Sequence, residues 1–220
     1  LYEEGDELLA DNILLQCSNL GESGKRLLDN QRKKQAKKCI DKYSWISAGI
    51  IATTPLPGID FIGTAAVNAQ MVIEIAKIYG LEMTKESAQE LAISVGKNLA
   101  GLGIIKGGFN LITTGLSINL PTLLFGRAVQ SIATAWLTRI AGASFITYFE
   151  QDQDWGDGGL QEVVKKHYEL NKRDSSLEKF LEIAIRKVVD PLKEKDRRQL
   201  PPRQRPQVVE DSLDHENQEY

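Results

Sequence analysis

"RAVQSIATAWLTRIAGASFITYF", residues 127–149, carries only two charged side chains, Arg127 and Arg139. The stretch before it, "GGFNLITTGLSINLPTLLFG" at 107–126, carries none. Apolar segments of this length are typical of helices, because buried strands run for only about 4 to 8 residues. The sequence therefore predicts an all-α protein, a glycine-rich helical bundle or set of helical hairpins, with four to six helices in its apolar part and no sheet.

Charge divides the chain into parts of different character. Residues 45–149 hold 11 of the 57 charged side chains but 12 of the 18 glycines, so the charges are concentrated in the flanks. We predict four parts in chain order: a connector helix at 1–42, an apolar glycine-rich helical core at 43–149, polar C-terminal helices at 150–195 and a disordered, proline-rich tail at 196–220. The net charge of −3 gives no reason to expect a nucleic-acid partner.

The connector has an acidic first half and a basic second half, and "GESG" at 21–24 interrupts its helical spacing. It is either one long helix or two helices with a soft joint. The basic residues lead directly into the apolar core: Lys25, Arg26, Arg32, Lys33, Lys34, Lys37, Lys38 and Lys42. Basic side chains beside an apolar segment attract anionic lipid by about 1 kcal/mol each and favour the cytoplasmic side of a membrane. A solvated face of a soluble bundle is the competing interpretation.

Two prolines and a glycine interrupt the apolar region at "TTPLPGIDFIGTAAVNAQ", residues 53–70. Pro55, Pro57 and Gly58 predict a turn between two apolar helices, and Asp60 is suited to cap the second. Such a turn would form a helical hairpin within or near a membrane. The stretches 43–67 and 107–126 have the length of a membrane span, about 20 residues, but both contain polar residues. Integral and peripheral association therefore both remain open.

Four glycines of the core have spacings that favour close helix packing. Gly103 and Gly107 are four residues apart, and Gly108 and Gly115 are seven apart on nearly the same face. Small residues at such spacings let helices approach closely in a bilayer, and they also occur in soluble helical cores. We therefore predict helix contacts at these glycines in either setting.

Local signals predict three helix boundaries. Thr84 is a plausible N-cap three residues before Ser87. Ser175 and Glu178 have the spacing of a capping box at the start of an amphipathic helix, and Pro191 should end that helix.

Motifs for catalysis, metals and nucleotides are incomplete in this chain. "GESGKR" at 21–26 lacks the first glycine and the magnesium-binding hydroxyl of a phosphate loop, and "NKRD" at 171–174 lacks the strand that a guanine-reading motif needs. The acidic loop at 150–159 fails the EF-hand register. His167 and His215 have no nucleophile to activate, and Cys17 and Cys39 have no metal-ligand spacing. We predict no catalytic residue, no metal site and no cofactor in this chain.

Several motifs in combination resemble one family. They are "TPLPGID" at 54–60, "AAVNAQMVIEIAKIYG" at 65–80, "LGIIKGG" at 102–108, "GRAVQ" at 126–130, "LTRIAG" at 137–142 and "FEQDQDWGDGG" at 149–159. This chain resembles the domain-of-unknown-function 697 family (YcjF-related) over about residues 8–190, and within it the C-terminal part of cyanobacterial-type Era- or dynamin-like GTPases.

The resemblance implies a helical, membrane-associated protein, and it supplies no catalytic residue. It also implies an upstream GTPase domain, with GTP and magnesium bound there, and it accounts for a chain that begins at Leu1 inside a helix. The function expected is a membrane-associated helical effector region of a GTP-binding protein, on the cytoplasmic side. Integral placement in the membrane and a homo-oligomeric state are open alternatives. The alternative is a soluble helical scaffold that binds a protein partner.

Overall fold

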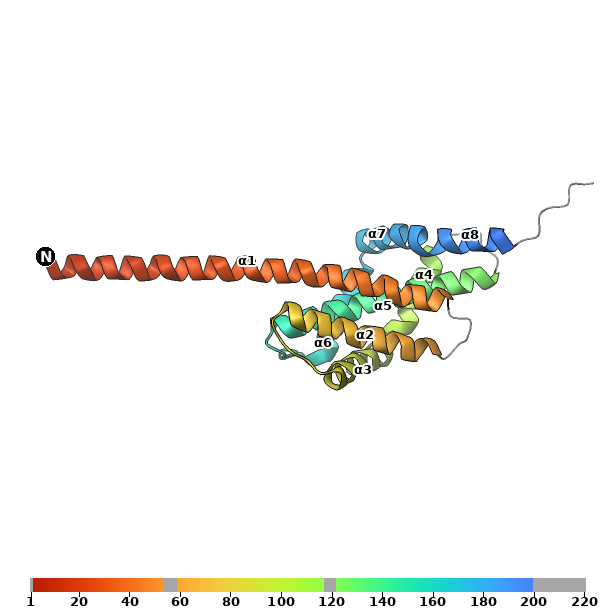
Figure 1. The fold of residues 1–220 in the computed structure, drawn as a ribbon, viewed down its shortest axis with the longest axis horizontal. Helices are drawn as coiled ribbons and strands as arrows, with labels where there is room; N and C mark the ends of the chain where they lie inside the picture. The colour runs from red at the N-terminus through yellow and green to blue at the C-terminus, as the bar shows by residue number, and fades with distance from the viewer. Residues whose placement is uncertain (1, 54–58, 117–121, 200–220) are drawn as a thin grey trace, which may run out of the picture.

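The computed structural model describes residues 2–53, 59–116 and 122–199, and within these residues all regular structure is helical. The prediction of an all-α fold with a long N-terminal helix is confirmed. The elements are α1 (Tyr2–Thr53), α2 (Ile59–Ile78), α3 (Lys85–Gly101), α4 (Ile104–Gly115), α5 (Thr122–Glu150), α6 (Gly159–Lys172), α7 (Asp174–Ala184), a π-helical turn η1 (Ile185–Val189) and α8 (Asp190–Gln199) (Figure 1).

Helix α5 forms the centre of the body. It is apolar around its circumference, and Trp136, Ile140 and Phe145 are at most 1% exposed. A helix without a polar face is stable in water only when other elements cover it on all sides. Helices α1, α4 and α6 pack against α5, and α1 makes the most extensive of these contacts.

Helices α1 and α5 run antiparallel and approach very closely. Lys33 of α1 pairs with Glu150 at the end of α5, and Asp41 pairs with Arg139 about three turns earlier along α5. Between these pairs, a Cβ added to Gly142 would lie 2.6 Å from Cγ1 of the buried Ile40. Glycine at this position therefore permits the short distance between the two backbones.

The other helices are arranged in layers around this pair. Figure 1 shows α2 and α3 on one side of α1 and α5, and α7 and α8 on the other side. Helix α2 returns alongside α1, so these two helices form an antiparallel pair. Residues Pro55, Pro57 and Gly58 lie outside the described residues, and Asp60 is the second residue of α2.

Of the three boundary predictions, the first is confirmed and the other two are wrong. The Thr84 hydroxyl accepts a hydrogen bond from the Ser87 N–H at 3.2 Å and caps α3. Helix α7 begins at Asp174, so Ser175 lies inside the helix. Pro191 is the second residue of α8, so the helical run continues past this proline. The π turn η1 comes directly before α8. The wider π turn changes the hydrogen-bond register just where proline removes a donor.

Helix α1 passes through Gly21 and Gly24 without a break. The connector is therefore one long helix and not two helices with a soft joint. The helix also continues beyond residue 42 into the body, as far as Thr53. Residues 12–31 are exposed on every side, and Figure 1 shows the first part of α1 projecting from the body. At the other end of the chain, α8 extends to Gln199, and the rest of the predicted tail lies outside the described residues.

We predict that Gly142→Ala lowers the free energy of unfolding by about 1 kcal/mol or more, because the new methyl group would overlap Ile40 and force the helices apart. Three Ile40 side-chain atoms lie within 3.1 Å of the added Cβ, so a rotamer change alone would not remove the overlap. Gly96→Ala in α3 is the matched control, since nothing lies within 4 Å of its Cβ position. The control should gain about 0.5–1 kcal/mol from helix propensity. Denaturant unfolding of both variants measures the difference, and an equal gain in both would contradict close packing at Gly142.

Candidate functional site

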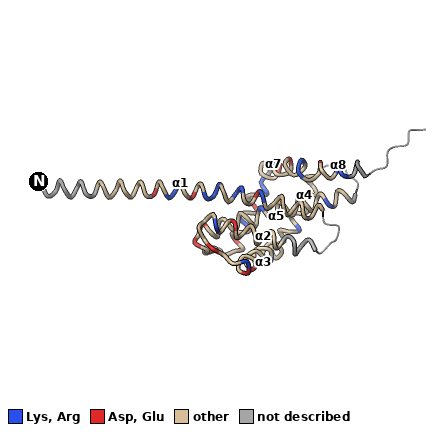
Figure 2. The backbone as a smooth tube through the Cα atoms, in the orientation of Figure 1, with Lys and Arg blue, Asp and Glu red and all other residues tan. Residues whose placement is uncertain are grey.

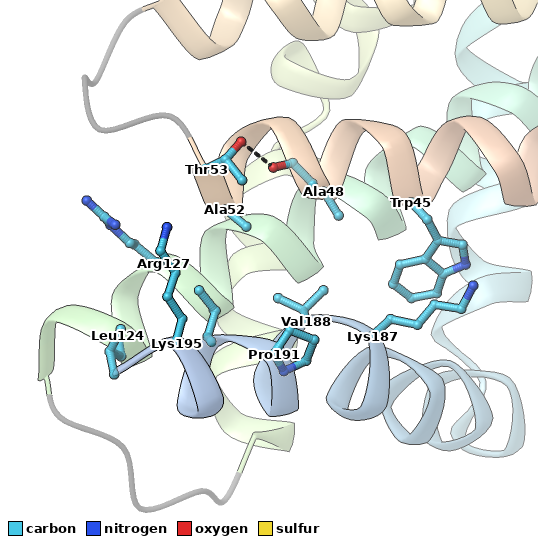
Figure 3. A pocket seen from close by; sticks show the side chains of 12 residues that line it. Trp45, Ala48, Ala52, Thr53, Leu124, Arg127, Lys187, Val188, Pro191 and Lys195 are labelled. Atoms are coloured by element: carbon cyan, nitrogen blue, oxygen red, sulfur yellow. Dashed lines mark hydrogen bonds between the residues drawn. The ribbon is translucent and has the colours of Figure 1, made fainter. Parts of the chain in front are cut away.

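A cavity of about 470 Å³ opens at one end of the body, where α1, α5 and the η1–α8 segment meet (Figure 3). Most of its wall is apolar or small. The lining residues are Trp45, Ala48, Gly49, Ala52 and Thr53 from α1, Leu124 and Arg127 from α5, and Lys187, Val188, Pro191, Leu192 and Lys195 from η1 and α8.

Three cationic side chains line this cavity, and among the residues that the structure describes no carboxylate does. Arg127, Lys187 and Lys195 come from three different elements, and none of them forms an ion pair within the described part of the chain. Figure 3 shows Arg127 and Lys195 near each other on one side and Lys187 beside Trp45 on the other. We call this arrangement of three cations over an apolar wall the cationic pocket.

The wall residue Trp45 is held by aromatic and cationic neighbours. Its ring stacks on Phe180 of α7 with centroids 5.6 Å apart, and the Arg139 guanidinium lies over both rings. Lys187 Nζ lies 5.2 Å from the Trp45 ring centroid. Asp41 in turn pairs with Arg139, so side chains of α1, α5 and α7 fix the tryptophan together.

The π-helical turn η1 positions the third side of the cavity. The Asp190 N–H bonds to the Ile185 carbonyl, which spans five residues instead of four. Val188 and Val189 are both buried, while Lys187 remains exposed at the cavity mouth. π turns inside helices are frequent at functional sites. The sequence analysis did not predict this π turn. The one signal for it was Pro191, which interrupts an otherwise helical pattern.

The predicted basic residues of α1 do not form one surface. Lys33 pairs with Glu150 at 3.1 Å and Lys42 with Glu74 at 3.0 Å, so both are directed to the body. Lys25 and Arg32 line a second cavity, of about 410 Å³, together with the carboxylates Asp29, Glu150 and Asp152. Arg26 pairs with Glu22 on the projecting part of α1. Lys34, Lys37 and Lys38 are exposed and have no ion pair among the described residues.

Glu74 of α2 collects three donors from α1. Tyr43 donates its hydroxyl at 2.6 Å, Lys42 its ammonium at 3.0 Å, and the Cys39 thiol lies 3.5 Å away. Burial alone would raise the pKa of Glu74, but the hydrogen bonds outweigh it and lower that pKa. Burial and the neighbouring Glu74 charge raise the pKa of Cys39 to about 12, so this thiol stays protonated. The cluster joins α1 to α2 and is not suited to catalysis.

Three of the four predicted contact glycines pack against helices of this chain. A Cβ on Gly107 would lie 3.0 Å from Tyr168 Oη, one on Gly108 2.8 Å from the Trp136 ring and one on Gly115 2.6 Å from Leu181. Helix α4 therefore uses these glycines to approach α6, α5 and α7. Gly103 differs, because no atom lies within 4 Å of its Cβ position and its φ of +68° places it in the turn before α4.

The other motifs lie in helices and in a local turn. Within the ranges that the structure covers, no group of three metal-binding side chains occurs. "NKRD" spans the end of α6 and the start of α7, with no strand beside it. In the acidic loop, Asp154 accepts a hydrogen bond from the Gly156 N–H and Trp155 packs on Tyr148, so these residues serve a local turn.

The family described as "Domain of unknown function (DUF697)" matches residues 15–173, which is well over half of the chain. The chain belongs to the DUF697 family. The match covers the α1–α5 pair and the glycine contacts of α4, but it ends before η1 and α8.

Curated relatives of this DUF697 chain are called "UPF0283 membrane protein". The one from Vibrio campbellii is 28% identical over 113 residues, 51% of this chain and 33% of its own length. The one from Pasteurella multocida is 35% identical over 108 residues, 49% of this chain and 30% of its own length. The matched region thus spans about a third of these relatives. No solved structure matches. Among the described helices of this chain, none combines the length and apolar content that a membrane span requires.

We predict that protonation of His167 destabilises the protein between pH 6.5 and pH 4. Its Nε2 lies 2.8 Å from the Thr147 hydroxyl, and burial, aided by Lys166 and Lys33, lowers its pKa to about 4. The folded state then binds fewer protons than the unfolded state below pH 6.5, so stability is full above that pH and falls towards pH 4.

The measurement is the free energy of unfolding against pH for the wild type and for His167→Gln, which retains a side chain able to hydrogen-bond Thr147. His215 is present in both proteins and cancels in the comparison. The difference between them should be constant above pH 7.5 and should shrink as the pH approaches 4. A constant difference over the whole range would show that His167 titrates normally.

Proposed function

We propose that this chain attaches a GTP-binding protein to anionic membranes peripherally, with the cationic pocket facing the lipid. The observation that carries the proposal is the pocket itself, in which Arg127, Lys187 and Lys195 surround an apolar wall that contains no carboxylate. The membrane-protein names of the relatives support membrane association. The GTP-binding part of the proposal rests on the family resemblance alone, and we assign the nucleotide and its magnesium to a separate domain.

The position of the pocket in the fold supports an end-on orientation. The end of α1, the start of α2 and the start of α5 lie at the same end of the body (Figure 1). The stretches 43–59 and 107–126, which contain no charge, include the residues around these helix ends. The carboxylates of Glu82, Glu150 and Asp152 come from the opposite end of the body, where α2 and α5 finish (Figure 2). The three pocket cations therefore lie at the other end of the body from these carboxylates.

The chemistry of the pocket fits a phospholipid. A guanidinium binds a phosphate through two parallel N–H donors, and a lysine ammonium adds a mobile point charge. Ala48, Leu124 and Leu192 offer apolar surface directly beside these cations. The headgroup would contact the cations and the upper part of the acyl chain would contact the apolar wall.

The exposed lysines of α1 are a second candidate for the membrane-facing surface. Lys34, Lys37 and Lys38 were expected near the membrane because they precede the apolar core. Along α1, Lys38 lies seven residues before Trp45, the nearest pocket residue of this helix, which corresponds to about 10 Å, and 15 residues before Thr53, about 22 Å. Both distances exceed one Debye length at physiological ionic strength, about 8 Å, so the interaction between the two surfaces is largely screened and each can be tested by its own variant.

The alternative function, a soluble scaffold that binds a partner through the glycine-rich face, has less support. Gly107, Gly108 and Gly115 already contact Tyr168, Trp136 and Leu181 of the same chain. That face of α4 is therefore occupied within the molecule.

We predict that the chain binds vesicles containing phosphatidylglycerol and not vesicles of phosphatidylcholine alone. The triple variant Arg127→Gln, Lys187→Gln, Lys195→Gln should lower the partition coefficient about a hundredfold, because each cation contributes about 1 kcal/mol at an anionic surface and 1.4 kcal/mol is tenfold. Vesicle flotation measures the bound fraction.

The matched control is Lys34→Gln, Lys37→Gln, Lys38→Gln, which removes the same charge from exposed positions on α1. It should leave binding nearly unchanged. Equal losses in both variants would show that total charge, and not the pocket, attracts the lipid. Loss in the control alone would assign the membrane to the side of α1, and no flotation of the wild type would refute membrane binding.

A further inference from the structure

The projecting part of α1 exposes large apolar side chains that nothing in the described structure covers. Ile13 is 54% exposed, Leu20 73% and Leu27 72%. Residues 12–31 are all exposed, and Lys25 and Asp29, which line the second cavity beside the body, lie on the opposite face of α1 from these apolar side chains. Such side chains on a stable helix of this length favour a partner that removes them from water.

The exposed residues have coiled-coil spacing. Ile13, Cys17, Leu20, Gly24 and Leu27 follow one another at intervals of 4, 3, 4 and 3 residues. This alternation keeps the side chains on one face of a helix, as at the a and d positions of a heptad repeat. We call this set the apolar stripe. Leu15 is also exposed, at 62%, but it lies on the opposite face of the helix.

The low stability of an isolated helix in water also favours a partner for the projecting part of α1. A solvated helix is marginal in water unless an apolar face is packed, and interior glycine costs about 1 kcal/mol relative to alanine. The projecting part of α1 contains Gly21 and Gly24, with nothing near either Cβ position. A packed neighbour would offset this cost, and Gly24 would let it approach closely.

We infer that the apolar stripe is covered by the same stripe of a second copy of this chain, in an antiparallel coiled coil. The charge pattern of α1 selects both the partner and its direction. The sequence is acidic at positions 3, 4, 6, 7 and 11 and basic at 25, 26, 32, 33, 34, 37 and 38. A parallel pair would place like charges side by side, whereas an antiparallel pair places each acidic segment beside a basic one.

The same heptad continues into the basic half. Seven residues after Leu27 comes Lys34, and Lys38 follows at the next interval of four. Both lysines are exposed, while Ala36, Ile40 and Tyr43 are buried against the body. The continuation of the apolar stripe therefore faces away from the body, and a second helix has room to lie along it.

One register satisfies the apolar and the charged positions together. If Leu20 packs beside the partner's Cys17, then Ile13 packs beside the partner's Gly24, and Lys34 lies level with the acidic start of the partner helix. The two helices then overlap from residue 2 to residue 35, about 50 Å or nearly five heptads. The apolar stripe fills about two heptads in the middle of this overlap, and acidic positions level with basic ones extend the pairing at both ends.

The first experiment measures the mass of the chain in solution by sedimentation equilibrium. The wild type should have twice the monomer mass of 24.5 kDa, and Leu20→Asp should be monomeric. Leu15→Asp is the matched control, because it introduces the same group at a similarly exposed leucine on the opposite face and should remain dimeric. A monomeric wild type, or a Leu15→Asp protein that dissociates as readily as Leu20→Asp, would overturn the inference.

The second experiment tests direction with single cysteines in a Cys17→Ser background. Ile13→Cys and Gly24→Cys chains, mixed and oxidised, should form the mixed disulfide, because these positions face each other. Ile13→Cys alone should not cross-link, since its two copies would lie 11 residues apart along the axis, about 16 Å, beyond the reach of a disulfide. Efficient cross-linking of Ile13→Cys to itself would indicate a parallel pair and overturn the inference.

Discussion

The close approach of α1 and α5 at Ile40 and Gly142 is the constraint on which the rest of the body depends. Both helices bury small side chains, including Ser44, Ser47 and Ala48 on α1 and Ser131 and Ala135 on α5. Small residues allow a short distance between helix axes, so the pair packs into a dense core. Towards the end of α1, the small residues Ala48, Gly49 and Ala52 leave space that no described side chain fills. The cationic pocket is that space.

Ion pairs and hydrogen bonds across this core decide which charges remain available. Glu150 accepts from Lys33 and Tyr79, Glu74 from Lys42 and Tyr43, and Asp41 pairs with Arg139. Partly exposed pairs of this kind contribute about 0–1 kcal/mol each, so they orient helices more than they stabilise them. Their main effect is to remove cations from the surface. The pocket cations and Lys34, Lys37 and Lys38 are among the described cations that no such pair neutralises.

Local signals in the sequence predicted local structure only in part. Thr84 caps α3 because an N-cap involves only a hydroxyl and an N–H three residues away. The length of each apolar segment is also a local signal, and it predicted the helices of the core. The sequence could not decide whether "GESG" breaks the connector helix. Two exposed glycines destabilise a helix by a few kcal/mol at most, so both a continuous helix and a joint are physically acceptable. Pro191 misled the boundary prediction because proline is incompatible with the interior of a regular α-helix, and a π turn at 185–189 relieves that conflict.

The pocket could not be predicted at all from sequence spacing. Its cations lie at positions 127, 187 and 195, and its tryptophan at 45, so only tertiary packing brings them together. The basic run at 25–42 is more conspicuous in the sequence, but the fold directs Lys33 and Lys42 to the carboxylates of α5 and α2. Adjacent positions on a helix point in different directions, and a run of like charges therefore seldom forms a single surface. The apolar stripe on α1 was visible as helical spacing, whereas its exposure became clear only once α1 was seen to project from the body.

Helix α1 links the two proposed surfaces rigidly. It supplies Trp45, Ala48 and Thr53 to the cationic pocket and carries the apolar stripe along its projecting part, without a break between them. In an antiparallel pair with Leu20 beside the partner's Cys17, the two copies of Thr53 would be separated by 69 residues of axial rise, about 100 Å. Their pockets would face in opposite directions. Two chains paired in this way could not both engage one flat membrane end-on, but they could hold two facing anionic surfaces at a distance set by the length of α1.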